Sequence, residues 1–99
     1  MKHMFIRYCQ ATDEWAKATV EERKNFIAKL KETAKEYGLE LIHFGPSLGV
    51  IESPAMVLTS DKSLDNYMNW MGAVMQSGLP RYIGASRTVT LVEAPWLRG

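Results

Sequence analysis

The stretch 39–60, LELIHFGPSLGVIESPAMVLTS, predicts two neighbouring strands and the turn that joins them. Aliphatic and aromatic residues dominate its two ends, whereas glycine and proline interrupt its middle. Because Pro46 has no amide donor, we expect the first strand to lie at a sheet edge or to carry a bulge. The run Ala55 to Ser60 is almost continuously apolar, which predicts a central strand covered on both faces.

A helix signal precedes this stretch. Residues Thr19 to Glu22 fit a capping box, in which the Thr19 hydroxyl and the Glu22 carboxylate each accept a hydrogen bond from the other residue's amide. Apolar residues follow at helical spacing, and Gly38 is suited to end the helix. The expected apolar stripe consists of Phe26, Ile27, Leu30, Ala34 and Tyr37. Upstream, Thr12 or Asp13 is suited to cap a single helical turn.

A second helix signal follows the stretch. Ser63 is suited to cap it, and Gly78 with Pro80 is suited to stop it. Its apolar stripe is rich in methionine, a residue that fills irregular gaps in cores and also forms adaptable binding surfaces. Core filling is the simpler interpretation of that stripe, which consists of Leu64, Met68, Met71 and Met75 and is widened by Tyr67, Trp70 and Val74.

Alternating runs at the two ends of the chain, Lys2 to Cys9 and Ser86 to Glu93, predict two further strands. The resulting order is strand, helix, strand, strand, helix, strand. This order is that of the ferredoxin-like α+β fold, βαββαβ, with one four-stranded antiparallel sheet. Because both crossovers are right-handed, the two helices are expected to cover the same face of the sheet.

The alternation also predicts which residues face the helices. We expect the more uniformly apolar set to lie under them: Met4, Ile6, Tyr8, Ile42, Phe44, Val89 and Leu91. The opposite, open face would then carry Phe5, Arg7, Cys9, Leu41, His43, Thr88, Thr90 and Val92. That face has too much apolar area to remain in water, so we expect a two-fold homodimer that packs sheet on sheet and leaves a cavity between the sheets.

Composition narrows the function classes. The 99 residues suit one domain, 1–99, and a net charge of +1 without a basic stripe argues against a nucleic-acid partner. No apolar run is long enough to span a membrane, and the N-terminal run is too short for a signal peptide. The single cysteine, Cys9, cannot form a disulfide within the chain, which suits a reducing cytoplasm.

His43 and Arg7 are the candidate catalytic pair. A histidine can act as an acid or a base, and an arginine can hold a carboxylate or an enolate. The alternative is a pair that merely completes hydrogen bonds across the dimer interface. Further candidates for ligand binding are Phe5, Cys9, Trp15, Tyr67, Tyr82, Thr88 and Thr90. No metal site is expected, because His3, Cys9 and His43 lie on strands far apart in sequence. No cofactor is expected either, because nothing beyond His43 supports a haem site.

The run Ser47-Leu48-Gly49, a turn, the strand Ala55 to Ser60, then Asp61 and a helix resembles part of the dimeric α+β-barrel superfamily, and is similar to its small GYD-type domains. The resemblance implies a homodimer with a pocket either between each sheet and its helices or between the sheets. Members of the superfamily include cofactor-independent monooxygenases, haem-handling enzymes, isomerases and ligand-sensing modules, and the fold does not choose among them.

Together these observations predict a small homodimer that binds a small, partly apolar molecule on the inner face of its sheet. The leading enzymatic hypothesis is oxidation or isomerisation without a cofactor, with His43 moving the proton and Arg7 holding the anion. The alternative is a non-catalytic module that senses a ligand or only dimerises. A cavity that contains both side chains would favour the first, and a filled interface would favour the second.

Overall fold

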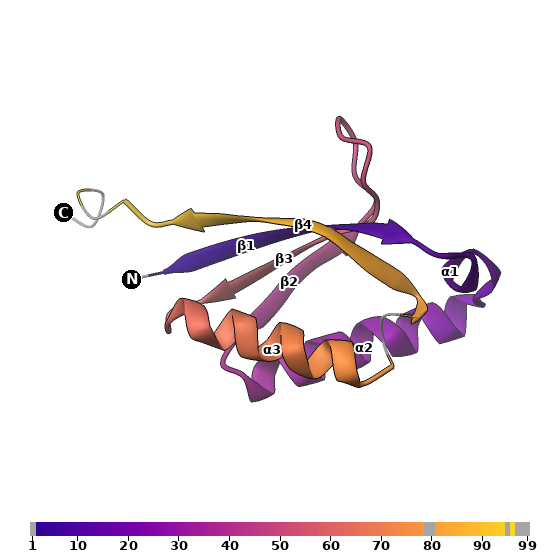
Figure 1. The fold of residues 1–99 in the computed structure, drawn as a ribbon, viewed down its shortest axis with the longest axis horizontal. Helices are drawn as coiled ribbons and strands as arrows, with labels where there is room; N and C mark the ends of the chain where they lie inside the picture. Colours follow the sequence, from indigo (N-terminus) through magenta and orange to yellow (C-terminus); the bar gives the residue numbers. More distant parts are fainter. Residues whose placement is uncertain (1, 79–80, 95, 97–99) are drawn as a thin grey trace.

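Four antiparallel strands form one sheet in the computed structural model, which describes residues 2–78, 81–94 and 96. The strand order is β2-β3-β1-β4. The helices α2 and α3 lie side by side on one face of this sheet (Figure 1). The predicted ferredoxin-like α+β fold is therefore confirmed. The elements are β1 (His3–Ala11), α1 (Asp13–Lys17), α2 (Val20–Glu36), β2 (Glu40–Gly45), β3 (Ala55–Ser60), α3 (Leu64–Gln76) and β4 (Ile83–Val92).

The predicted ends of α2 are confirmed. The Glu22 amide donates to the Thr19 hydroxyl at 3.1 Å, and the Thr19 amide donates to the Glu22 carboxylate at 3.0 Å. After the helix, Gly38 has a φ of +75°, and a Cβ at this position would lie 2.9 Å from Nδ2 of Asn66. A side chain at Gly38 is therefore disfavoured by the backbone conformation, whereas the nearby atoms belong to the flexible ends of Asn66 and Lys62 and could move aside.

The short helix α1 is held by Thr12, as predicted. The Thr12 hydroxyl accepts from the Trp15 amide at 3.3 Å and lies 2.6 and 2.8 Å from the carbonyl oxygens of Arg81 and Tyr82. It thereby joins the end of β1 to the segment that leads into β4. Ser63 occupies the predicted capping position of α3, but its side chain forms no capping hydrogen bond.

The edge and central strands lie where the sequence predicts them. β2 is an edge strand, and its pairing with β3 shifts register between Leu41 and His43. This irregularity leaves Ile42 exposed and turns both Leu41 and Phe44 toward the helices. The bulge therefore lies before Gly45 and Pro46. The prediction that Leu41 and His43 share a face is wrong. The prediction that Ile42 and Phe44 share the other face is wrong for the same reason.

The predicted orientation of β1 is also wrong. Phe5, Arg7 and Cys9 are buried, and they lie on the helix-covered face rather than on the open one. The register carries the same inversion to β4, because Thr88 lies opposite Arg7 and Thr90 opposite Phe5. Met4, Ile6, Tyr8, Val89 and Leu91 consequently face away from the helices.

The reason for this inversion lies in α3. The ring of Phe5 stacks on the ring of Tyr67 at 4.2 Å with planes 9° apart, and Trp70 packs beside Tyr67 at 5.8 Å. These aromatic contacts require Phe5 to lie under the helix. Uniform hydrophobicity did not identify the covered face, because the open face is itself largely apolar.

The capping box predicts a pH-dependent stability. Hydrogen bonds from the Thr19 amide, and secondarily from its hydroxyl, lower the pKa of Glu22 below its ordinary value of 4.5. Because the pKa of Glu22 is lower in the folded than in the unfolded protein, its ionised carboxylate stabilises the folded state at pH values above the ordinary pKa. This stabilisation is lost as the pH falls through the lowered pKa of the folded state. We expect Thr19→Ala to reduce the free energy of unfolding by about 1 kcal/mol at neutral pH.

Urea unfolding of wild type and Thr19→Ala at neutral pH and at a pH well below 4.5 measures this effect. The difference between the two proteins should shrink at the acidic pH, because the mutation removes the hydroxyl contact that lowers the pKa of Glu22, and a protonated Glu22 gains nothing from that contact. The backbone amide of residue 19 is present in both proteins. An equal difference at both pH values would show that the box does not act in this way.

Candidate functional site

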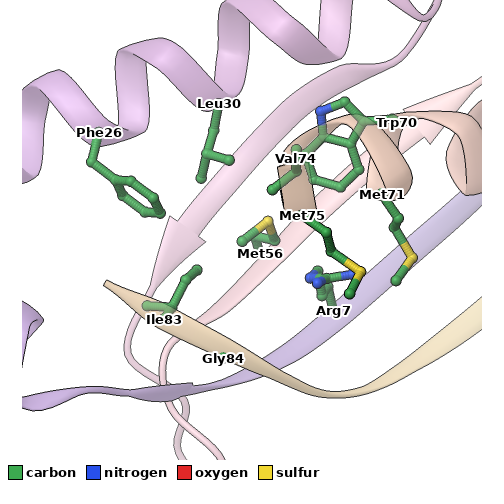
Figure 2. Close-up of a pocket in the computed structure, with 10 residues that line it drawn as sticks. All are labelled: Arg7, Phe26, Leu30, Met56, Trp70, Met71, Val74, Met75, Ile83 and Gly84. Atoms are coloured by element: carbon green, nitrogen blue, oxygen red, sulfur yellow. The ribbon is translucent and has the colours of Figure 1, made fainter. Parts of the chain in front are cut away.

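A cavity of about 290 Å³ lies between the two helices and the sheet (Figure 2). α2 and α3 provide its roof, whereas β1, β3 and the start of β4 provide its floor. It is lined by Arg7, Phe26, Leu30, Met56, Trp70, Met71, Val74, Met75, Ile83 and Gly84. Arg7 is the only charged residue in this lining, so the cavity is an apolar space with one cationic group.

Arg7 is buried without a carboxylate partner. Its side chain is 7% exposed, and among the residues that the structure describes no acidic side chain pairs with it. Among the described residues its guanidinium makes a long hydrogen bond, from Nη1 to the hydroxyl of Tyr67 at 3.4 Å, and lies near the Cys9 thiol. A guanidinium has five N–H donors, so most of its hydrogen-bonding capacity is left for a group inside the cavity. Figure 2 shows Arg7 among the apolar side chains that line the cavity.

Tyr67 supports Arg7 from α3. Its hydroxyl lies 2.7 Å from the Thr88 hydroxyl, and either oxygen can be the donor. Its ring is held by the stack on Phe5. Phe5, Arg7, Tyr67 and Thr88, all candidates from the sequence, therefore lie in contact on the covered face of the sheet. Thr90 lies one register step further along β4 and is exposed.

Cys9 lies in the core next to this group. Its side chain is fully buried, and its thiol lies 3.7 Å from the carbonyl oxygen of Arg7, a weak contact. Burial raises the pKa of Cys9, and the nearby Arg7 charge opposes that rise only in part. A thiol with a raised pKa is a poor nucleophile at neutral pH. The geometry of Cys9 therefore suits packing.

His43 does not join Arg7. It is exposed and pairs with Val57 on the face of the sheet that the helices leave uncovered. The prediction that His43 and Arg7 share one face is therefore wrong, and within one subunit they cannot act on the same bound molecule. Whether either residue is catalytic stays a prediction.

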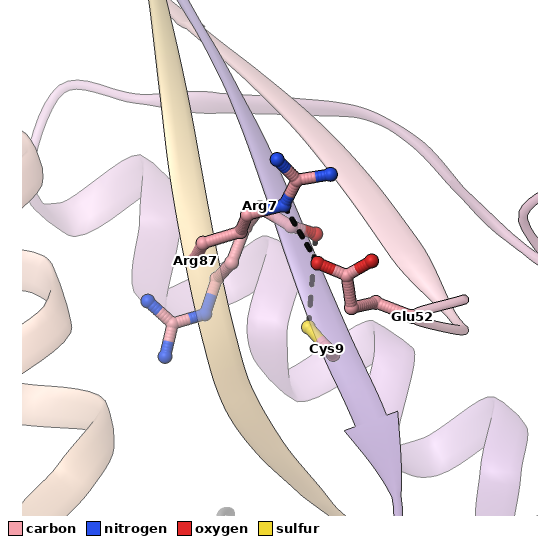
Figure 3. A network of polar contacts seen from close by, with 4 residues as sticks. All are labelled: Arg7, Cys9, Glu52 and Arg87. Atoms are coloured by element: carbon pink, nitrogen blue, oxygen red, sulfur yellow. Dashed lines mark hydrogen bonds and ion pairs between the residues drawn. The ribbon is translucent and has the colours of Figure 1, made fainter. Parts of the chain in front are cut away.

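Arg87 shows the contrast between the two faces. It projects to the open side of the sheet, where its Nε lies 2.6 Å from a carboxylate oxygen of Glu52 and its guanidinium lies over the ring of Tyr8. Figure 3 shows the guanidinium groups of Arg7 and Arg87 on opposite sides of the sheet. The exposed arginine thus has an acidic partner, whereas the buried one has none in the part of the chain that the structure describes.

Trp15 and Tyr82 form a separate aromatic cluster. Both rings contact Phe26, with centroids 5.7 and 5.3 Å from it, and Trp15 also contacts Phe44. Phe26 lines the cavity and so joins it to this cluster. Trp15 and Tyr82 themselves are not in the cavity lining, so their predicted part in ligand binding is indirect at most.

Sequence reasoning missed most of the cavity. The helical stripes predict core packing for several residues that in fact line the cavity, namely Phe26, Leu30, Trp70, Met71 and Met75. A usable signal was the pair Met71 and Met75, which one helical turn places on the same side of α3. Met56, Ile83 and Gly84 carried no such signal, because only the tertiary fold brings β3 and β4 to these helices.

The described residues offer no support for a metal cluster, a membrane-spanning helix or a haem site. Within residues 2–78, 81–94 and 96 no three metal-ligating side chains gather at one point. None of the described helices is long and apolar enough to cross a membrane. At about 30 Å³ per water-sized group, the cavity holds roughly ten heavy atoms, and no histidine lines it, so it does not fit a haem.

Comparison with known proteins shows the fold alone. No family model matches the sequence, and no curated protein matches it. A mutant chlorite dismutase from Candidatus Nitrospira defluvii superposes with a TM-score of 0.68 at 13% identity, covering 95% of this chain and 40% of that one. Chlorite dismutase from the same organism in complex with imidazole gives a TM-score of 0.69 at 13% identity, covering 95% and 41%.

Protein Atu4242 from Agrobacterium tumefaciens matches with a TM-score of 0.52 at 14% identity over 97% of this chain and 96% of that one. The chain therefore spans about 40% of the length of the chlorite dismutase chains and nearly all of the length of Atu4242. These likenesses support the predicted resemblance to dimeric α+β-barrel and GYD-type domains at the level of the fold.

The unpaired charge of Arg7 predicts an unusual response to mutation. An isolated buried charge destabilises a folded protein, and an unbranched apolar side chain of similar length avoids that cost. We expect Arg7→Met to raise the free energy of unfolding by about 1–2 kcal/mol. Replacement of a functional residue often stabilises a protein in this way, because such residues are kept for function rather than for stability. Urea unfolding without ligand measures it. A loss of more than about 1 kcal/mol would show instead that Arg7 is a structural residue.

Proposed function

We propose that this protein is a homodimer of α+β-barrel subunits, and that each subunit binds a small, largely apolar molecule between its sheet and its helices. The observation that carries the proposal is the apolar cavity with Arg7 as its one charged residue. This placement differs from the open face that the sequence predicted, because Phe5 and Arg7 lie under the helices.

The cavity supports a ligand on energetic grounds. An unfilled apolar space costs stability because the atoms around it lose packing contacts, at roughly 24 cal/mol per Å³ in measured cases. Ligand pockets are commonly about 300–1,000 Å³ and largely apolar with a few polar groups. The cavity is at the lower end of that range. A ligand of roughly ten heavy atoms would restore the missing contacts.

The open face of the sheet supports the homodimer. It presents a row of apolar side chains that the described chain does not cover, namely Met4, Ile6, Tyr8, Val57, Val89 and Leu91. The loop between β2 and β3 rises on the same side, away from the helices (Figure 1). Its tip carries Leu48 and Ile51, which are 96% and 97% exposed. A second copy packed on this face would cover both the sheet and the loop.

The geometry favours the non-catalytic alternative, a ligand-sensing module, over the enzymatic hypothesis. His43 lies on the opposite face from the cavity, and no histidine or carboxylate is part of the cavity lining. An oxidation or isomerisation in this cavity would therefore find no acid or base among the residues that line it. A cytoplasmic location is part of the proposal and is supported by the single, buried cysteine.

Ligand entry is tested with methionine methyl resonances, because this chain carries methionines inside and outside the cavity. Titration with octan-1-ol or octanoate should shift Met56, Met71 and Met75, which line the cavity, more than Met4 and Met68. A saturable shift confined to the first group is the expected result. Equal shifts in both groups, or no saturable shift with either compound, would contradict the proposed site.

A variant that fills the cavity provides the matched control. Val74 lines the cavity from α3, so the larger side chain of Val74→Phe should occupy part of that space. We expect at least a tenfold loss of binding, and urea unfolding of the variant shows that it remains folded. Gly72→Ala, on the exposed side of α3, should increase stability without affecting binding.

The homodimer is tested by charge on the open face. Leu91→Asp or Ile51→Asp should convert a dimer into a folded monomer, because each residue is exposed in the lone subunit but buried in the proposed interface. Sedimentation equilibrium at micromolar protein is the measurement. Val20→Asp, at the exposed start of α2, is the control and should remain dimeric. A wild-type monomer would contradict this part of the proposal.

A further inference from the structure

We propose that the molecule bound in the cavity is a small apolar carboxylic acid, with its carboxylate against Arg7 and its hydrocarbon part among the methionines and Trp70. This inference rests on the proposed ligand-binding function and narrows it to one chemical class. It depends on three features of the described residues: an unpaired buried cation, a hydroxyl beside it, and an apolar space of matching size.

The unpaired cation requires an anion. Buried charges in proteins are normally paired, because an isolated ion loses its hydration without compensation. Arg7 is buried, and no carboxylate within the described parts of the chain pairs with it. The protein itself thus supplies the positive half of an ion pair, and the negative half has to come from a molecule in the cavity.

A carboxylate suits the donors at this point. The planar guanidinium presents N–H groups in a fork that matches the two oxygens of a carboxylate. Tyr67 positions the guanidinium without lining the cavity itself, because its hydroxyl accepts from Arg7 Nη1 and lies 2.7 Å from the Thr88 hydroxyl.

The rest of the cavity suits a hydrocarbon. Away from Arg7 its side chains are aliphatic, aromatic or thioether, including Leu30, Met56, Trp70 and Val74. The volume of about 290 Å³ corresponds to roughly ten heavy atoms, as in a carboxylate with a seven-carbon chain. A second charge on the ligand would have no partner among these residues, which favours a monocarboxylate.

The way in lies at the last turn of α3. Met75 lines the cavity and is also 67% exposed, so its side chain lies at the mouth. Arg7 lines the same cavity (Figure 2). A methionine has three rotatable bonds and can move aside at low cost. The carboxylate would therefore bind close to the mouth, with the chain directed toward Leu30 and Phe26.

A comparison of octanoate with octan-1-ol tests the charge preference, because the two differ mainly in the charged group. Dissociation constants are measured by isothermal titration at pH 7.5 in wild type, Arg7→Met, Arg7→Lys and Lys29→Met. Lys29 is exposed on α2, so Lys29→Met removes one positive charge away from the cavity. Each variant is first shown to be folded by its methionine methyl spectrum.

Wild type and Lys29→Met should bind octanoate about tenfold to a hundredfold more tightly than octan-1-ol, the range expected for a hydrogen-bonded charge pair. Arg7→Met should lose this preference while still binding octan-1-ol, and Arg7→Lys should keep only part of it, because lysine lacks the fork. The preference should persist at raised salt, because a buried pair is poorly screened.

Three results would overturn the inference or its basis. Equal affinity for the two compounds in wild type, or a preference that survives in Arg7→Met, would exclude the carboxylate site but leave the apolar ligand cavity standing. A preference that Lys29→Met also abolishes would show that only overall charge matters. If neither compound binds to wild type, the proposed function itself fails.

Discussion

The stack of Phe5 on Tyr67 is the contact on which the site depends. Two rings 4.2 Å apart and almost parallel fix α3 over β1, and they determine which face of the first strand is covered. Because side chains alternate along a strand, this one choice places Arg7 and Cys9 under the helices together with Phe5. It also turns Tyr8 and Arg87 to the open side, where the guanidinium of Arg87 forms an ion pair with Glu52.

The position of Arg7 indicates a compromise between stability and binding. If only stability mattered, an apolar residue would suit this buried position better, as leucine does at the buried positions 58 on β3 and 30 on α2. The charged side chain instead lies beside an apolar cavity with one long hydrogen bond. Such a residue lowers the stability of the empty protein and raises its affinity for an anion, which is the usual exchange at binding sites.

The two faces of the sheet are both apolar, but they differ in what covers them. The covered face provides the core and the cavity, so whatever binds there is enclosed by one subunit. In the proposed homodimer, the open face and the tip of the β2–β3 loop, which rises on that side (Figure 1), would form the surface for a second copy. The likeness to chlorite dismutase and to Atu4242 supports this layout as a fold, and at 13–14% identity it does not determine the ligand.

The sequence by itself determined the elements and their order. The capping box at Thr19, the stop at Gly38, the edge position of β2 and the central position of β3 all depend on local chemistry that neighbouring residues display. It also identified Arg7 and Tyr67 as candidates. Only the tertiary structure decided which face of β1 lies under the helices, because both faces are apolar and alternation cannot rank them. The cavity also depends on the tertiary structure, because its walls come from five elements that are separate in the sequence. The bulge before His43 turns that residue to the opposite face of the sheet from Arg7.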